Sequence, residues 1–241
     1  MQDRGLAAYV AELVGTFFLV FVIGTVVSLY VAAGGQAQFG SDFAVVGLVE
    51  GFVLFALIAI LVRTSGGHFN PVVTLAAALM RKMNPADAVV YILAQLSGGV
   101  LGALLVKGLL EDEGRATDYG ALAVSPLLSG NFAGMVVEGL GAFLLVLAMI
   151  AMVIGPKTMR LIGPLTVGFT FSFLVMIFGP LTGAGFNPAR WFGPALVGES
   201  FGGVWPFLVG PIVGSVLAVA FYMFVLAPTE GSEEPEQASG A

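Results

Sequence analysis

Six long runs of apolar residues dominate this chain of 241 residues. About 20 predominantly apolar residues cross the hydrocarbon core of a bilayer as a helix. A soluble domain is about 25% charged, whereas this chain is 10% charged and 58% hydrophobic and cannot cover itself with a polar surface. Lipid is therefore the expected solvent. The predicted spans lie at roughly 8–33, 43–62, 88–106, 132–154, 161–181 and 204–227.

Two shorter apolar pieces, 70–80 and 187–197, each begin with an Asn-Pro pair. Asn is favoured at the N-cap of a helix, and Pro is favoured at the first helical position. The two pairs therefore predict helix starts. About 11 residues at about 1.5 Å each give roughly 16 Å, which is half of the ~30 Å hydrocarbon core. Neither piece is long enough to cross the membrane.

The same elements recur in the same order along the chain. AELVGTFFLVF (11–21) matches VEGLGAFLLVL (137–147), and SGGHFNPVVTLAAAL (65–79) matches TGAGFNPARWFGPAL (182–196). Each repeat, 1–110 and 130–227, holds three spans with one Asn-Pro piece after the second. Because three is odd, the second repeat enters the membrane inverted, and such repeats share a site near the midplane. The acidic stretch 228–241 is predicted to be a disordered tail.

The glycine-rich segments before the half-helices predict a polar path through the membrane. Extended backbone inside a bilayer is tolerated only where it is buried in protein or lines a wet cavity. Its carbonyls form a ladder of acceptors, and the two Asn amides are donors at the midpoint. The converging helix N-termini add positive potential, which rejects cations and admits small neutral molecules. The predicted carbonyl ladder comprises Gly66, Gly67, His68, Gly183 and Gly185.

The duplicated Asn-Pro element, the GGHFNP loop, the NPAR sequence and the paired Glu12 and Glu138 closely resemble the aquaporin (major intrinsic protein) family. The resemblance covers about 1–227 and is strongest to archaeal members. It implies an all-α membrane protein with six transmembrane helices, two re-entrant Asn-Pro half-helices and an inverted 3+3 repeat. It also implies a homotetramer with one pore per subunit, through which water and small neutral solutes pass passively across the lipid bilayer.

The resemblance also assigns roles to particular residues. Glu12 and Glu138 are expected to support the re-entrant loops by accepting their N–H groups, and Arg190 is expected to line the narrowest constriction. Gln95 is expected to bind loop backbone and not to line the pore. The two motifs are Asn70-Pro71-Val72, where the family usually has Ala third, and Asn187-Pro188-Ala189; the four selectivity-filter positions are Glu50, Val175, Ala184 and Arg190.

The filter departs from the family pattern at Glu50, where an aromatic residue is usual. Two alternatives follow from this departure. Either Phe52 takes the pore mouth after a local shift, or Glu50 pairs with Arg190 and neutralises it. The aliphatic Val175 favours a somewhat wider pore, whereas Trp191, at a position where glycerol channels usually have Asp, favours water.

Charge and composition limit the remaining function classes. The chain has no cysteine, one histidine and a net charge of −6, so we expect no enzyme activity, metal site, cofactor or nucleic-acid partner. A glycerol facilitator remains an alternative, and an ion-coupled secondary transporter is a distant one. The positive charges favour a multi-pass protein of the cell (plasma) membrane with both termini in the cytoplasm. Arg4, Arg63, Arg81, Lys82, Lys157 and Arg160 fall on one side, and Lys107, Arg115 and Arg190 fall on the other.

Overall fold

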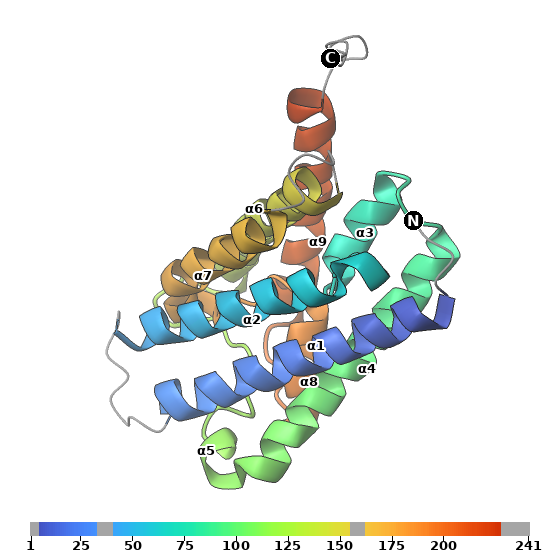
Figure 1. The fold of residues 1–241 in the computed structure, drawn as a ribbon. Coiled ribbons are helices and arrows are strands. Elements are labelled where there is room, and N and C mark those ends of the chain that lie inside the picture. The colour runs from blue at the N-terminus through green and yellow to red at the C-terminus, as the bar shows by residue number, and fades with distance from the viewer. Residues whose placement is uncertain (1–4, 33–40, 155–161, 228–241) are drawn as a thin grey trace, which may run out of the picture.

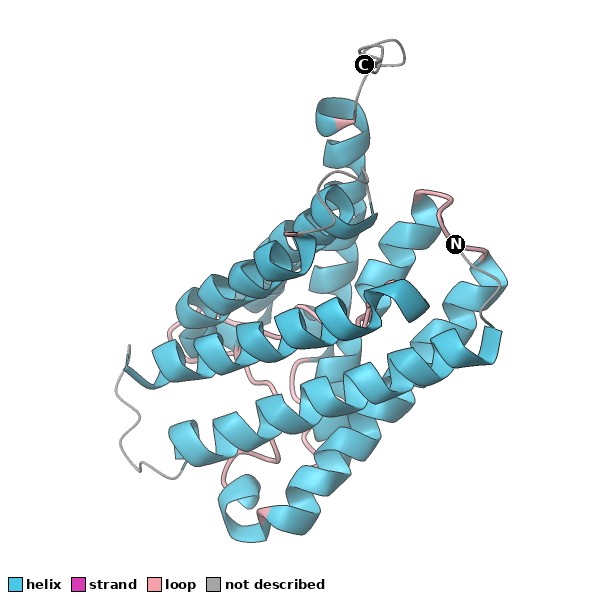
Figure 2. Ribbon diagram, viewed as in Figure 1, coloured by secondary structure: helices cyan, strands magenta, loops and turns pink. Residues whose placement is uncertain are grey.

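The computed structural model describes residues 5–32, 41–154 and 162–227, and these ranges contain helices and loops but no strand (Figure 2). Six helices are long and apolar enough to cross a membrane, which confirms the six predicted spans. They are α1 (Gly5–Val27), α2 (Ser41–Ser65), α4 (Pro85–Leu109), α6 (Asn131–Met149), α7 (Gly163–Thr182) and α9 (Val204–Phe221). The predicted tail 228–241 and the charges Arg4, Lys157 and Arg160 lie outside the described residues.

Short helical segments complete the fold. The half-helices α3 (Pro71–Leu79) and α8 (Pro188–Val197) have 9 and 10 residues, or about 14 and 15 Å at about 1.5 Å per residue. They confirm the two predicted pieces. A five-residue helix, α5 (Glu111–Arg115), follows α4 and was not expected from the sequence. Single π-helical turns, η1 (Ser28–Ala32), η2 (Ile150–Ile154) and η4 (Tyr222–Leu226), extend α1, α6 and α9.

The two halves of the chain pack in the same way and then against each other. Helix α1 packs along α4 in the first half, and α6 packs along α9 in the second, while α2 and α7 pair across the halves (Figure 1). Half-helix α3 contacts α9, and α8 contacts α4. Each half-helix is therefore held in part by the last span of the opposite half, which brings the two Asn-Pro motifs together.

Glycines allow the backbones of the paired spans to touch. A Cβ atom added to Gly98 in α4 would lie 2.3 Å from the Leu13 carbonyl oxygen in α1. A Cβ atom added to Gly214 in α9 would lie 2.2 Å from the Gly139 carbonyl oxygen in α6. In lipid, helices associate through close packing, because the lipid tails are as apolar as the side chains. The absence of a Cβ atom at these points therefore sets the separation of the spans.

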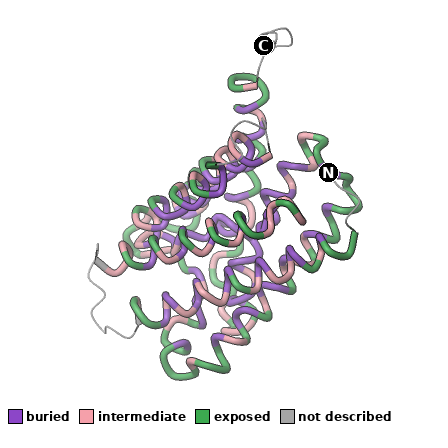
Figure 3. The backbone as a smooth tube through the Cα atoms, viewed as in Figure 1, coloured by how far each residue is buried: buried purple, intermediate pink, exposed green. Residues whose placement is uncertain are grey.

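Burial is reversed relative to a soluble protein. Large apolar side chains cover the outer surface: Leu6 is 76% exposed, Phe132 is 74% exposed and Ile60 is 71% exposed. Figure 3 shows the buried residues on the inward-facing sides of the helices. The buried set includes an unusual number of polar groups, among them Glu12, Glu50, Gln95, Glu138 and Arg190. Buried charges are rare and functional in membrane proteins, and they direct attention to the interior.

Candidate functional site

Each half-helix begins with the side chain of its asparagine. The Oδ1 atom of Asn70 accepts a hydrogen bond of 3.0 Å from the Val72 N–H, and the Oδ1 atom of Asn187 accepts one of 2.9 Å from the Ala189 N–H. These are the N-cap contacts expected of an Asn-Pro start. Val72 therefore donates to the cap of α3 in the same way as Ala189 donates to the cap of α8, despite its larger side chain.

The same two side chains join the halves of the protein. The Nδ2 atom of Asn70 donates to the Phe186 carbonyl at 3.0 Å, and the Nδ2 atom of Asn187 donates to the Phe69 carbonyl at 2.9 Å. Backbone N–H groups only donate and carbonyls only accept, so these four contacts fix both amide orientations. An amide NH₂ group has two donors. Within these contacts, each asparagine keeps one N–H for a further acceptor.

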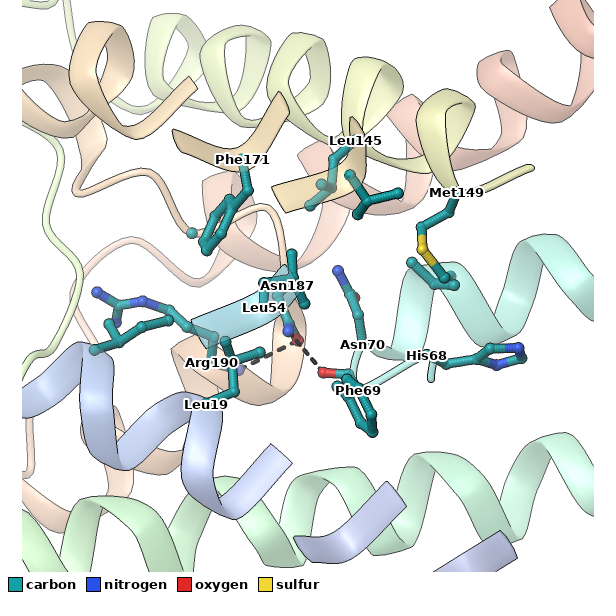
Figure 4. Close-up of a pocket in the computed structure, with 14 residues that line it drawn as sticks. Leu19, Leu54, His68, Phe69, Asn70, Leu145, Met149, Phe171, Asn187 and Arg190 are labelled. Atoms are coloured by element: carbon teal, nitrogen blue, oxygen red, sulfur yellow. Dashed lines mark hydrogen bonds between the residues drawn. The ribbon is translucent and has the colours of Figure 1, made fainter. Parts of the chain in front are cut away.

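Both asparagines line a narrow internal cavity, which Figure 4 shows with Arg190 near one end and His68 near the other. The space open to the centres of water molecules is about 20 Å³, which slightly exceeds the ~10–15 Å³ that one water needs. The cavity is therefore just large enough to admit water. Its other lining residues are Leu19, Ile23, Leu54, Phe69, Val73, Leu145, Met149, Val167, Phe171 and Gly185.

Glu12 holds the first re-entrant loop. Its carboxylate accepts the His68 N–H at 3.0 Å and the Phe69 N–H at 2.7 Å. It also accepts the Ser65 hydroxyl at 2.6 Å and the Gln95 amide at 2.8 Å. The two backbone N–H groups have no helical partner, and leaving them unpaired in a dry interior is costly. The carboxylate supplies the acceptors that this loop lacks.

Glu138 makes the equivalent contacts in the second half. It accepts the Gly185 N–H at 3.0 Å, the Phe186 N–H at 2.6 Å and the Thr182 hydroxyl at 2.6 Å. The backbone contacts are those that the sequence led us to expect of the paired glutamates. The side chain of Gln95 differs from expectation, because it donates to Glu12 and to the Thr74 hydroxyl and not to loop backbone. It finds these side chains because α4 passes beside α3.

The re-entrant loops turn more sharply than the extended backbone predicted for them. Phe69 and Phe186, which precede the two asparagines, have left-handed φ values of 49° and 50°. Each ring packs on a span glycine: an added Cβ would lie 2.1 Å from a ring atom of Phe69 at Gly15, and 2.1 Å from one of Phe186 at Gly141. The turn is required because the loop must aim the asparagine at the cavity, and the paired carboxylates hold the conformation in place.

Arg190 is buried and lies along the cavity. One of its terminal N–H groups donates to the Gly120 carbonyl in the segment between α5 and α6, while its Nε–H has no partner. Glu50 and Glu138 are the carboxyl groups that act electrostatically on its guanidinium. No ion pair within 4.0 Å joins Glu50 to Arg190; among the described residues, the ion pair within that distance is Arg115–Glu111. Glu50 and Arg190 therefore make no contact ion pair, and neutralisation of Arg190 by Glu50, one of the two alternatives, would act over a longer distance.

The other filter positions are enclosed. Glu50, Val175 and Ala184 are 1%, 1% and 0% exposed, and none of them borders the cavity of Figure 4. Phe52 is 51% exposed on the outer surface of an unbroken α2. The alternative that placed Phe52 at the pore mouth is wrong, because α2 makes no local shift. Gly66, Gly67 and Gly183 belong to the re-entrant loops with positive φ values, but they do not border this cavity either.

The apolar wall of the cavity was not expected from the sequence, although the repeat carries its signal. Leu19 and Ile23 in α1 are one helical turn apart, as are Leu145 and Met149 in α6. The offset that aligns AELVGTFFLVF with VEGLGAFLLVL relates each residue of the first pair to one of the second. Lining residues can therefore be found as an inward stripe that both repeats share.

Six spans around two half-helices, with a narrow cavity at their junction, define a polytopic membrane channel. The model of the major intrinsic protein family matches residues 2–222. The chain belongs to this family. It is 35% identical to the probable aquaporin TIP2-2 of Oryza sativa subsp. japonica over 95% of this chain and 92% of that protein.

Other relatives agree with this assignment. The aquaporin AqpM of Methanothermobacter thermautotrophicus is 32% identical over 90% of this chain and 96% of that protein. This chain is thus similar to a comparable degree to an archaeal member and to a plant member, and the expected likeness to archaeal members extends to plant members as well. The X-ray structure of the aquaglyceroporin from Plasmodium falciparum has a TM-score of 0.76 and 22% identity over 92% of this chain and 97% of that chain. This last likeness shows the fold.

Proposed function

We propose that this chain is a passive channel that conducts water in single file and excludes ions and protons. The observation that carries the proposal is the pair of asparagine N–H groups left for a further acceptor at the meeting point of two half-helices. Both amides face a cavity whose volume, about 20 Å³ for the centres of water molecules, is just large enough to admit water. A water molecule there accepts from the amides through its oxygen, while the apolar wall from α1, α2, α6 and α7 offers it no competing partner.

This geometry also accounts for the exclusion of protons and cations. A central water whose oxygen accepts from both amides has its own hydrogens directed outward along the file, so it does not accept a proton from its neighbours. The N-termini of α3 and α8 add positive potential at the same point. Half-helix dipoles of this kind exclude protons and cations in channels. Arg190 adds a full positive charge toward one end of the path.

The buried residues around the path divide into two roles in this proposal. Glu12 and Glu138 hold the loops through the hydrogen bonds described above and take no part in transport. The carbonyls of the two re-entrant loops, from Gly66, Gly67 and His68 and from Gly183 and Gly185, accept hydrogen bonds from water on the way to the asparagines. Glu50, Val175, Ala184 and Arg190 form the selectivity filter, which the family spacing supports.

Water is favoured over larger solutes because the cavity holds little more than one water. Passage of a polyol requires the walls to move apart. A glycerol facilitator is the second candidate, and the aliphatic Val175 is the observation that favours it. Stopped-flow light scattering on vesicles that contain the purified protein separates the two. Protein vesicles that shrink no faster than protein-free vesicles under an impermeant osmolyte would contradict the channel, and re-swelling in glycerol as fast as water exit would favour the facilitator.

We also propose the placement of the chain in the membrane and its assembly. Arg63, Arg81 and Lys82 support cytoplasmic termini in the plasma membrane through the positive-inside bias. The family resemblance supports a homotetramer with one pore per subunit. It also supports a division into the repeats 1–110 and 130–227, with the acidic stretch 228–241 outside them. Protease protection of a C-terminal tag in intact cells tests the orientation, and the mass of the detergent-solubilised particle tests the assembly.

A further inference from the structure

His68 is the one histidine of the chain, and the channel described above uses only its backbone carbonyl. Of the described residues that border the cavity, it alone has a neutral side chain with a basic nitrogen. It lies at the end of the cavity opposite Arg190 (Figure 4). A neutral imidazole has one nitrogen that carries a proton and one that carries a lone pair. The nitrogen that faces the path decides whether the ring donates to water or offers it a base.

Glu12 begins a chain of hydrogen bonds whose directions are fixed. Two backbone N–H groups and the Ser65 hydroxyl donate to its carboxylate, and an ionised carboxylate only accepts. Gln95 must therefore turn its NH₂ group, and not its oxygen, toward Glu12, where the distance is 2.8 Å. The second hydrogen of the same NH₂ group points to Oγ1 of Thr74, 2.9 Å away.

The hydroxyl of Thr74 passes this direction on to the histidine ring. Thr74 is fully buried, and among the described residues its side chain bonds Gln95 and Nδ1 of His68, the latter at 3.1 Å. If Nδ1 carried the ring proton, the Thr74 oxygen would accept twice and its own hydrogen would have no acceptor, which is costly in a dry interior. The hydroxyl therefore donates to Nδ1, and the ring proton lies on Nε2.

The Nε2 atom of His68 is left for the path. It makes no hydrogen bond with the described residues, and it is not one of their buried polar atoms that lack a partner. Tyr91 packs beside the ring with a centroid distance of 5.5 Å, but its hydroxyl donates to the Ser65 carbonyl and does not compete. Glu12 also binds the His68 backbone N–H. One carboxylate therefore holds the backbone of His68 directly and its ring through two intermediate side chains.

We propose that Gln95 and Thr74 are positioning residues that hold His68 in the tautomer with its proton on Nε2. This N–H is a fixed donor to water at its end of the path. The lone pair of the ring lies on Nδ1, where the Thr74 hydroxyl occupies it. The inference rests on the proposed channel and deepens its account of proton exclusion.

A donor at this point agrees with the orientation proposed for the water file. Waters on either side of the two asparagines accept from the inner neighbour and direct their hydrogens outward. A water beside His68 accepts from Nε2–H through its oxygen and keeps that orientation. A lone pair on Nε2 would instead attract a hydrogen of the file and supply a base on which a proton rests. The Gln95–Thr74 chain removes this base from the path.

The test observes the ring directly, because a purification tag without histidine leaves a single imidazole in the sample. The full-length protein, labelled with ¹⁵N-histidine, is studied in lipid bilayers by magic-angle-spinning NMR at about pH 8, where an ordinary imidazole is neutral. We expect Nδ1 without a proton, Nε2 bonded to one, and transfer of magnetisation from water to the Nε2 proton. A proton on Nδ1, or an Nε2–H out of contact with water, would overturn the proposal.

Variants test the positioning residues with the same spectrum. Thr74→Val keeps the branched shape and removes the hydroxyl, and we expect the ratio of the Nε2–H to the Nδ1–H tautomer to fall about fivefold, which corresponds to about 1 kcal/mol. Gln95→Leu is expected to lower the ratio as well, although Gln95 makes no hydrogen bond to the ring. Thr25→Val is the matched control, because its hydroxyl is buried without a partner, and it leaves the ratio unchanged.

An unchanged ratio in Thr74→Val or in Gln95→Leu would contradict the role of that residue. The wild-type spectrum decides the tautomer even where neither variant folds. Osmotic water flux in vesicles separates this inference from the channel on which it rests. Wild-type vesicles without fast water flux would refute the channel, whereas fast flux with a proton on Nδ1 would refute the tautomer alone.

Discussion

Replacement of Glu138 by Gln gives the sharpest test of how the pore is held. In the structure, Oε1 of Glu138 accepts from Thr182 and the Gly185 N–H, and Oε2 accepts from the Phe186 N–H. A Gln side chain has one oxygen, so one of its positions presents an NH₂ group to a backbone donor. Whichever way the amide is turned, one backbone N–H loses its partner in the membrane interior.

The magnitude follows from the bonds that are lost. One unpaired buried N–H costs about 1–3 kcal/mol, and each of the other two bonds loses about 1 kcal/mol when its acceptor becomes neutral. The sum is about 3–5 kcal/mol before any gain from removing a buried charge. Glu50→Gln is the matched control, because it makes the same change at an equally buried site whose Oε2 has no partner. The difference between the two variants isolates the hydrogen bonds.

The assay is thermal unfolding in detergent at a single scan rate, followed by tryptophan fluorescence, with water flux in vesicles as the functional readout. At about 2–4 °C per kcal/mol for a chain of this size, we expect Glu138→Gln to unfold on the order of 10 °C below Glu50→Gln. Its water permeability is expected to fall as well, because Asn70 bonds the Phe186 carbonyl. Equal unfolding temperatures for the two variants would refute the assigned role of Glu138.

Two further predictions concern packing and the cavity wall. Gly98→Ala places a Cβ atom 2.3 Å from the Leu13 carbonyl oxygen and is expected to destabilise the protein by about 1–3 kcal/mol. Gly108→Ala in the same helix is the control, because its Cβ atom meets nothing within 4 Å and the change is expected to be tolerated. Similar unfolding temperatures for the two variants would contradict the α1–α4 packing. The chain has no cysteine, so Val167→Cys adds the only thiol, which is a soft ligand for mercury. Mercury(II) is expected to lower the water flux of this variant several-fold, and an added thiol is expected to restore it. Wild type and Phe169→Cys, whose site is 53% exposed on the outer surface, serve as controls, and flux in Val167→Cys that mercury leaves unchanged would remove Val167 from the path.

The sequence predicts the architecture well because its strongest signals are physical requirements of the membrane. A span must be apolar for about 20 residues, and a helix that starts inside the bilayer needs a cap such as Asn70 or Asn187. The loop conformation was less predictable. Left-handed φ values at Phe69 and Phe186 are unusual for aromatic residues, and they arise from tertiary contacts that local propensity does not contain. The glycines beneath the rings were visible as the Glu-x-x-Gly pattern of both repeats, but their partners were not.

The filter was the least predictable part, because its chemistry depends on which atoms meet. Family spacing identified Glu50 and Arg190 as filter positions and left two alternatives open, Phe52 at the pore mouth or a pairing of Glu50 with Arg190. The structure instead gives Arg190 to the Gly120 carbonyl, a contact between positions 70 residues apart that no local pattern encodes. The sequence therefore could not predict that Nε of Arg190 and Oε2 of Glu50 are both buried without a hydrogen-bond partner.

The three buried glutamates therefore differ in how many hydrogen bonds their carboxylates accept from the protein. Glu12 has four donors, Glu138 has three, and Oε2 of Glu50 has none. Burial alone does not separate them, since each is at most 1% exposed. A carboxylate whose oxygens are filled by the protein has no capacity left for a permeant and acts as support. Oε2 of Glu50 accepts from no protein donor, so the number of protein donors, and not the residue type, separates the two glutamates that support a re-entrant loop from Glu50.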